Sequence, residues 1–117
     1  MICVCLCVTS VTPQLSKLTA SGGDDECEDV LGALREVCGM GWSGRARFCV
    51  LVCDSPGHGS ELHDGTINDS HPRGIGGLTA ESMMKTLREK DIELLMCYLQ
   101  PKTTRVMDTV FRYYVFK

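Results

Sequence analysis

The segment Arg47-Phe48-Cys49-Val50-Leu51-Val52-Cys53-Asp54 runs from Phe48 to Cys53 without a polar residue. A continuous apolar run of this length is typical of a strand covered on both faces, as in the centre of a parallel sheet. The run stops abruptly at Asp54, which is predicted to lie at the carboxyl end of the strand. In open α/β sheets ligands bind beyond this end, so the segment predicts both a buried strand and a place for a site.

Helical periodicity surrounds this strand. Upstream, apolar residues at helical spacing predict a helix from about Glu28 to Cys38, capped by Asp24 or Asp25 and stopped by Gly39. Downstream, residues 55–77 form a long loop rich in Gly, Pro, His and Asp. A loop of this length in a compact domain is usually functional or mobile.

The last third of the chain continues the alternation of helix and strand. Thr79 is predicted to cap a helix that reaches about Lys90, and Ile92 to Leu99 is predicted to be a strand. Thr103 or Thr104 is predicted to start the last helix. Helix and strand in alternation imply a parallel sheet with right-handed crossovers.

At the amino end, Ile2 to Val8 is apolar and β-prone, and predicts an edge strand within residues 1–10. Pro13 is predicted to open a short helix with Leu15 and Leu18 pointing inward. We therefore expect one α/β domain over residues 1–117, a three-layer Rossmann-like arrangement with about three strands flanked by helices.

Composition excludes some classes of partner. The net charge is −3 and no Lys/Arg run is present, which argues against nucleic acid because phosphate binding needs a clustered basic surface. The apolar run from Ile2 to Val8 is far too short to span a membrane. The eight cysteines lie mostly inside periodic apolar segments, with no Cys-x-x-Cys pair. Buried thiols of this kind predict a reducing, cytoplasmic compartment.

Acidic residues cluster at the predicted carboxyl edge of the sheet. Asp24, Asp25 and Glu28 precede the first long helix, and Asp54 ends the central strand. Carboxylates brought together would repel one another unless a hard cation such as Mg²⁺, Ca²⁺ or Mn²⁺ lay between them. The alternative is that these residues only cap a helix and a turn, and the residues by themselves leave both open.

The long loop holds a second polar set. His58, His63 and His71 accompany Asp64 and Asp69, a combination that suits either a transition-metal site or solvated loop polarity. Catalysis by a Ser55–His58 pair is disfavoured because no Gly-x-Ser-x-Gly elbow is present. No catalytic residue is therefore predicted.

Two motifs carry a family resemblance. The segment Ala20-Ser21-Gly22-Gly23-Asp24-Asp25-Glu26-Cys27-Glu28-Asp29-Val30-Leu31-Gly32-Ala33-Leu34 resembles the loop and helix of von Willebrand factor A (VWA) domains. The segment Arg47 to Gly59, with Asp54-Ser55-Pro56-Gly57-His58-Gly59 at its end, resembles the family's strand ending in Asp-Ala-Pro-x-His-Gly. The resemblance runs from about Val11 to the end of the chain. It is closest to the VWA domains found beside α-type protein kinase domains.

The resemblance implies a metal-ion-dependent adhesion site, in which a divalent cation such as Mg²⁺ binds a carboxylate of a partner protein. Asp54 matches the family's Asp at the end of the fourth strand, Glu28 matches the acidic ligand before the helix, and Asp25 matches an adjacent cation position. The family's Asp-x-Ser-x-Ser is absent, since Val8 to Thr12 has hydroxyl groups but no Asp. The implied domain is therefore an amino-terminally truncated fragment with an incomplete site.

The expected function is non-catalytic protein binding through the top of the sheet. One alternative is a regulatory or docking fragment of an α-type protein kinase, and another is a structural remnant without a ligand. Self-association is expected through sheet edges left exposed by the missing strands.

Overall fold

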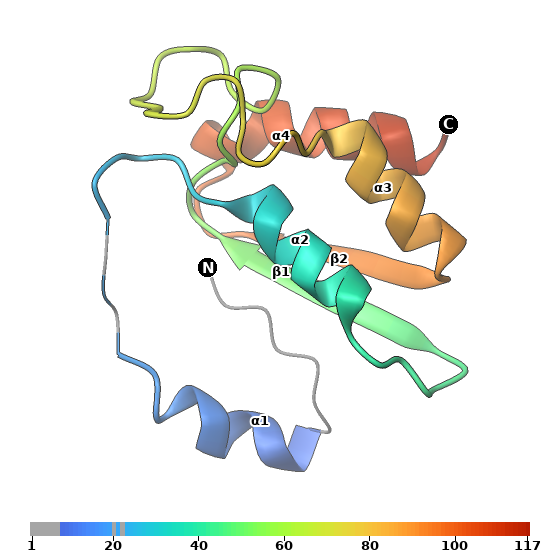
Figure 1. Ribbon diagram of the computed structural model, residues 1–117. Helices are drawn as coiled ribbons and strands as arrows, with labels where there is room; N and C mark the ends of the chain where they lie inside the picture. Colours follow the sequence, from blue (N-terminus) through green and yellow to red (C-terminus); the bar gives the residue numbers. More distant parts are fainter. Residues whose placement is uncertain (1–7, 20, 22) are drawn as a thin grey trace.

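The computed structural model describes residues 8–19, 21 and 23–117, which form a mixed helix and strand fold (Figure 1). Two parallel strands lie side by side with helices around them, which is compatible with the predicted α/β class. About three strands were predicted, and the described residues form two. The elements in chain order are α1 Val8–Leu15, α2 Val30–Gly39, β1 Arg47–Cys53, α3 Ala80–Glu89, β2 Ile92–Tyr98 and α4 Pro101–Val115.

The sheet consists of β1 and β2 in parallel, with Arg47 opposite Ile92 and Cys53 opposite Tyr98. Parallel neighbours need a crossover connection, and α3 lies within it. Both strands therefore end at the same edge, where the Leu99 N–H donates to the Cys53 carbonyl at 2.8 Å. The long loop after β1 begins at this carboxyl edge, and so does α4 (Figure 1).

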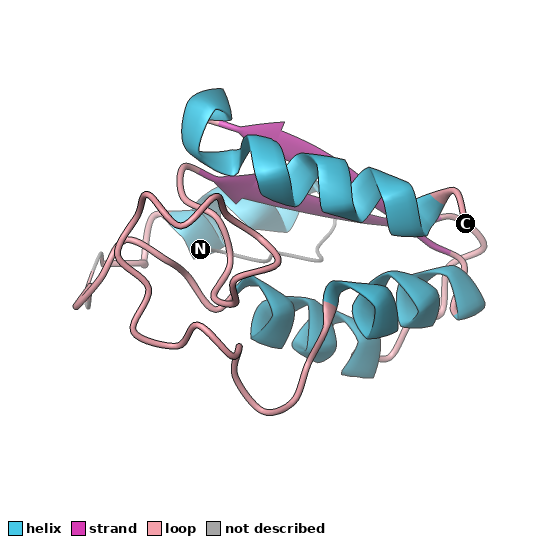
Figure 2. Ribbon diagram, turned by 90° about the horizontal axis from the view of Figure 1, so that it is seen from above, coloured by secondary structure: helices cyan, strands magenta, loops and turns pink. Residues whose placement is uncertain are grey.

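The expectation that β1 is buried on both faces is wrong. Its residues alternate, with Cys49, Leu51 and Cys53 buried, whereas Phe48 and Val50 are 50% and 45% exposed. The reason is that the helices with which the strand packs lie on one side: Figure 2 shows both strands on the same side of α2 and α3. An apolar run cannot by itself reveal whether a second layer is present.

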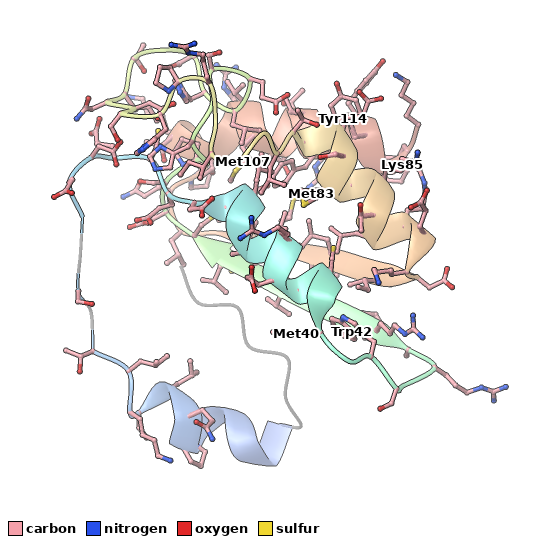
Figure 3. All side chains as sticks on the ribbon, in the orientation of Figure 1. Met40, Trp42, Met83, Lys85, Met107 and Tyr114 are labelled. Atoms are coloured by element: carbon pink, nitrogen blue, oxygen red, sulfur yellow. The ribbon has the colours of Figure 1, made fainter. Side chains whose placement is uncertain are left out.

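The core lies between the covered face of the sheet and three helices. Met83 of α3 and Met107 of α4 are both buried in this core, and Figure 3 labels them beside α2. Leu62, from the long loop, is also fully buried, so the loop is anchored to the core. The helical residues of the core are Val30, Leu31, Leu34, Val37, Cys38, Ala80, Met83, Met84, Leu87, Met107 and Phe111.

Of the helix caps predicted for α2 and α3, one is confirmed and two differ from the structure. Thr79 caps α3, as predicted, in a reciprocal capping box with Ser82. The cap of α2 is Asp29, whose side chain accepts from the Gly32 N–H at 3.0 Å, and not Asp24 or Asp25. The helix continues through Gly39 and is followed by Met40, so Gly39 is its last residue instead of the residue beyond it.

The last helix begins earlier than predicted, at Pro101 with Gln100 as its cap. Proline suits the first helical position because its fixed φ is helical and its missing N–H needs no partner there. Thr103 and Thr104 lie inside the first turn, where the Thr104 hydroxyl donates to the Gln100 carbonyl at 2.9 Å and the Thr103 hydroxyl lies 3.0 Å from the same oxygen. The threonines therefore stabilise the start of α4 without defining it.

The amino-terminal predictions were partly wrong. Residues 8–10, predicted to belong to an edge strand, are helical, and Pro13 lies inside α1 instead of opening a helix. Leu15 and Leu18 are 42% and 53% exposed and do not point inward. Figure 1 shows α1 apart from the other elements, which explains the exposure of Leu15. The rest of the predicted strand, residues 1–7, lies outside the described residues.

Among the helices of the described residues, none combines the length and the apolar character needed to cross a membrane.

Candidate metal site at the carboxyl edge of the sheet

The two motif segments of the sequence meet through their backbones. Glu28 forms an isolated parallel bridge with Gly57. Its N–H donates to the Pro56 carbonyl at 3.0 Å, and its carbonyl accepts from the His58 N–H at 2.9 Å. The loop before α2 is thus joined to the chain that leaves β1, just beyond the carboxyl edge of the sheet.

Position 57 leaves little room for a side chain because the chains approach closely there. A Cβ atom at this position would lie 2.7 Å from Leu62 Cδ1 and 3.2 Å from Val30 Cβ. The Gly57 N–H also points into the core, toward Met107 Sδ at 3.3 Å. The glycine of the Pro-Gly-His segment therefore allows the bridge to form against packed side chains.

A second connection binds the far part of the long loop to the same acidic segment. Glu26 and Asn68 exchange hydrogen bonds, with the Glu26 N–H donating to the Asn68 carbonyl at 3.2 Å and the Asn68 N–H donating to Glu26 Oε2 at 2.8 Å. The backbone N–H and hydroxyl of Ser70 donate to Asp25 Oδ2 at 2.7 and 2.6 Å. Residues 25–28 are therefore held at two places along residues 56–70.

The carboxylate of Asp69 accepts hydrogen bonds from several parts of the long loop. Its carboxylate, 3% exposed, accepts from His58 Nδ1 at 2.7 Å and His63 Nε2 at 2.9 Å. It also accepts from the backbone N–H groups of Gly59 at 2.9 Å and His71 at 2.8 Å. Burial alone would raise the pKa of this carboxyl, but the four donors outweigh burial and hold its pKa well below the usual value. Asp69 is therefore an anion that organises the loop.

Two groups of metal-ligating side chains result. Cys27, His63 and Asp69 form one group, and Asp25, His58 and His71 form the other, each with ligand atoms within 4.8 Å of one another. The prediction of a transition-metal set in the loop therefore has a geometric basis, although Asp64 is absent from both groups.

In the group at Cys27, the histidine and the carboxylate are held by hydrogen bonds and the thiol is buried. His63 Nδ1 accepts from the Gly65 N–H at 3.1 Å, so Nε2 carries the proton donated to Asp69. No nitrogen lone pair of this ring is left for a metal. Burial, aided by nearby carboxylates, raises the pKa of the Cys27 thiol to about 11, which keeps it neutral. The group of Cys27, His63 and Asp69 therefore has a structural role.

The group at Asp25 has a different hydrogen-bond state. Asp69, which can only accept, takes the proton of His58 Nδ1 and leaves Nε2 of that ring with a lone pair. Ser70 gives its single hydroxyl proton to Asp25, so it accepts from His71 Nδ1 at 3.0 Å, and Nε2 of His71 also keeps a lone pair. His58 and Asp25 side chains are 10% and 9% exposed, whereas His71 is exposed.

The cation ligands predicted from the sequence lie around this region. Asp25 belongs to the histidine group, Glu28 forms the backbone bridge, and the Asp54 carbonyl accepts from the Thr103 hydroxyl at 2.7 Å. The two groups of described residues that converge include Asp25 but neither Glu28 nor Asp54. A shared site of Asp25, Glu28 and Asp54 therefore stays a prediction.

Sequence reasoning did not find the contribution of Ser70 or the central position of Asp69. Asp25 and Ser70 are 45 positions apart, and no periodic pattern connects them. The available signal was the abundance of His and Asp between Ser55 and Gly77, which indicated a polar site without its pairing.

A separate hollow lies away from these loops, at the amino end of β2. Its volume is about 490 Å³, and it is lined by residues of α3, β2 and α4 that include Met84, Leu87, Ile92 and Phe116. No group of metal ligands among the described residues lies in its walls.

Comparison with known proteins finds no family model that matches the chain. No solved structure matches it. The chain is similar to the Alpha-protein kinase vwkA of Dictyostelium discoideum, with 28% identity over 99 residues. The matched region is 83% of this chain and 16% of that protein, whose name suggests a VWA domain. The chain is thus weakly similar to a small part of a kinase-associated protein.

Proposed function

We propose that the chain is a non-catalytic, protein-binding module of the VWA type whose cation-binding adhesion site is incomplete. The observation that carries this proposal is the bridge between Glu28 and Gly57, which joins the two VWA-like motifs at the carboxyl edge of the sheet. Similarity to an α-type protein kinase whose name suggests a VWA domain supports the same proposal.

An adhesion-site Mg²⁺ would need near-ideal octahedral oxygen coordination. The chain lacks the Asp-x-Ser-x-Ser segment, and one oxygen of Asp25 already accepts two hydrogen bonds from Ser70. The nearest ligands to Asp25 in its group are histidines, which do not suit Mg²⁺. Partner binding in this proposal therefore relies on direct contacts at the carboxyl edge of the sheet more than on a bridging cation.

The surface proposed for the partner is the carboxyl rim, defined as Asp54, Leu99 and Gln100. All three are exposed, and Leu99 is 64% exposed among polar neighbours. Their backbones are fixed, since Leu99 donates to the Cys53 carbonyl and Thr103 donates to that of Asp54. An apolar anchor on a rigid polar rim is suited to binding a protein surface.

The test is Leu99→Asp compared with a matched control, Phe116→Asp. Phe116 is 84% exposed and follows α4, whose first residue lies at the rim and whose last lies about 20 Å away at 1.5 Å per residue. The proposal expects saturable capture of one protein by the wild type and the control, and at least about tenfold weaker binding by Leu99→Asp. Equal binding by all three chains would show that the partner does not bind at the rim, and the absence of saturable binding would support the structural-remnant alternative.

A second candidate, favoured by the match to an α-type kinase, is a regulatory or docking segment of such an enzyme. The isolated chain is expected to transfer no phosphate from ATP to a peptide substrate. Binding of a separately purified α-type kinase domain, weakened by Leu99→Asp, would identify the partner class. Phosphotransfer by the isolated chain would contradict both candidates.

A further inference from the structure

We propose that the outer edge of β2, together with the hollow beside it, binds an extended segment of another protein as an added strand. This inference goes beyond the proposed function, because the hollow lies at the amino end of β2 and contains no residue of the carboxyl rim. It rests on the direction of the backbone groups of β2 and on the residues that line the hollow.

Half of the backbone groups of β2 point away from β1. Among the described residues β2 pairs with β1 alone, so its other edge carries no strand. The Leu99 N–H donates to the Cys53 carbonyl, so every second residue counted back from Leu99 directs its backbone groups toward β1. The residues between them, Ile92, Leu94 and Met96, therefore direct their N–H and C=O groups outward. An unpaired row of this kind is a template for another extended chain.

The hollow follows the same edge. Its volume is about 490 Å³, and its wall includes Ile92, Glu93 and Leu94, which are consecutive in the strand. Consecutive side chains point to opposite faces of a sheet, so a space that touches all three lies along the edge and not over one face. No residue of β1, which is described over its whole length, lines the hollow. The hollow is therefore on the outer side of β2.

Apolar side chains of the neighbouring helices complete the hollow. Met84 and Leu87 of α3 line it, together with Val115 of α4 and the following Phe116. Binding by strand addition combines hydrogen bonds along an edge with pockets for alternate side chains. The outward backbone groups of β2 and this apolar wall offer both kinds of contact to the same extended segment.

Charge defines the kind of segment that fits. The charged residues of the wall are two arginines and two acids, Arg88, Arg112, Asp91 and Glu93. Arg112 is paired with Asp108 at 2.9 Å, which leaves the two acids facing Arg88 alone. Both acids lie at the start of β2. The complementary segment is therefore apolar, with a basic residue at the end that meets Glu93.

The first test is amide hydrogen exchange of the full chain, followed by NMR without a peptide. The N–H groups of Leu94 and Met96 should exchange rapidly, whereas those of Leu95 and Cys97, which face β1, should be protected. Equal protection of both pairs in dilute protein would show that the edge is already covered. Protection of Leu94 and Met96 that grows with protein concentration would show that a second copy binds there. Either result would overturn the proposal.

The second test adds a blocked peptide of the sequence Lys-Thr-Val-Thr-Val-Thr to the same sample. At saturation it should slow exchange of the Leu94 and Met96 amides by about tenfold or more and leave that of Leu95 unchanged. The same peptide with N-methyl groups along its backbone keeps its side chains but cannot donate hydrogen bonds, so it should have no effect. Absence of saturable protection up to about 1 mM peptide would contradict the proposal.

Glu93→Lys tests the charge at the start of the strand. It should weaken binding of the lysine peptide by about threefold or more and strengthen binding of the peptide in which glutamate replaces lysine. Glu36→Lys, at an exposed acid of α2 that does not line the hollow, is the matched control. Equal effects of the two substitutions would place the peptide elsewhere and overturn the proposal. Because these measurements change no rim residue, their failure would leave the rim proposal standing.

Discussion

At the scale of single residues, Asp69 has the largest structural consequence. A buried carboxylate is costly unless donors surround it, and here two rings and two backbone groups supply them. One side chain therefore connects residues 58–71, and the ring states of His58 and His63 depend on it.

Replacement of Asp69 by Asn should destabilise the protein by about 3 kcal/mol, because an amide NH₂ would face N–H donors and leave them unpaired. Urea unfolding followed by the fluorescence of Trp42 measures this change. Asp64→Asn is the matched control, since Asp64 is exposed and its partner Thr66 lies in the same turn. An equal effect of both substitutions would show that Asp69 does not organise the loop.

Burial also sets the reactivity of the thiols. It raises the pKa of Cys53 to about 11, with the nearby Asp54 adding to the effect, whereas Cys97 is exposed. At pH 8 only about one Cys53 side chain in a thousand would be a thiolate, and reactivity should appear as the pH rises toward 11.

Alkylation of the native chain at pH 8, read by peptide mass spectrometry, should therefore modify Cys97 long before Cys53. In urea the two should react at similar rates. Fast modification of native Cys53 would mean that the covered face of β1 opens readily.

At the scale of elements, α3 shows how a local signal is retained in the fold. Thr79 and Ser82 exchange hydrogen bonds at its start, and Met83, Met84 and Leu87 cover the core. The Ala80 N–H is satisfied from outside the helix, by Glu61 Oε1 at 3.0 Å. The long loop and the helix it precedes are therefore coupled.

Thr79→Ala should cost about 1 kcal/mol of stability by removing the capping box. Thr109→Ala is a suitable control because that hydroxyl only donates to the Arg105 carbonyl inside α4. The control should be neutral or slightly stabilising, since alanine is the better helix former. Chemical unfolding of the two variants measures the free energy of unfolding of each. An equal decrease in both variants would contradict the capping argument.

At the scale of the whole molecule, the open face of the sheet is the main exposed apolar feature of the described residues. Phe48, Val50, Val52 and Leu95 are each at least 40% exposed, and Val50 pairs with Leu95. Contiguous apolar surface and two edge strands both favour association between copies.

Val50→Lys should reduce concentration-dependent self-association, as measured by sedimentation velocity, because a charge would lie in the middle of this face. Stability should change by less than about 0.5 kcal/mol, since the side chain is already half exposed. Phe116→Lys, at the end of the chain, is expected to leave association unchanged. Unaltered sedimentation of Val50→Lys would show that copies do not meet through this face.

The sequence by itself determined the order of helices and strands from α2 onward and the position of β1 and α3. Apolar periodicity and caps such as Thr79 act within a few residues, so they can be read locally. It also predicts that Asp25, Glu28 and Asp54 lie near one edge, because parallel strands end on the same side.

Only the tertiary structure decided that β1 has one open face and that Asp25 lies with histidines. The bridge of Glu28 with Gly57 and the bonds from Ser70 to Asp25 join residues far apart in the chain. Such contacts depend on loop closure and on hydrogen-bond satisfaction in the folded state, and neither leaves a periodic trace in the sequence.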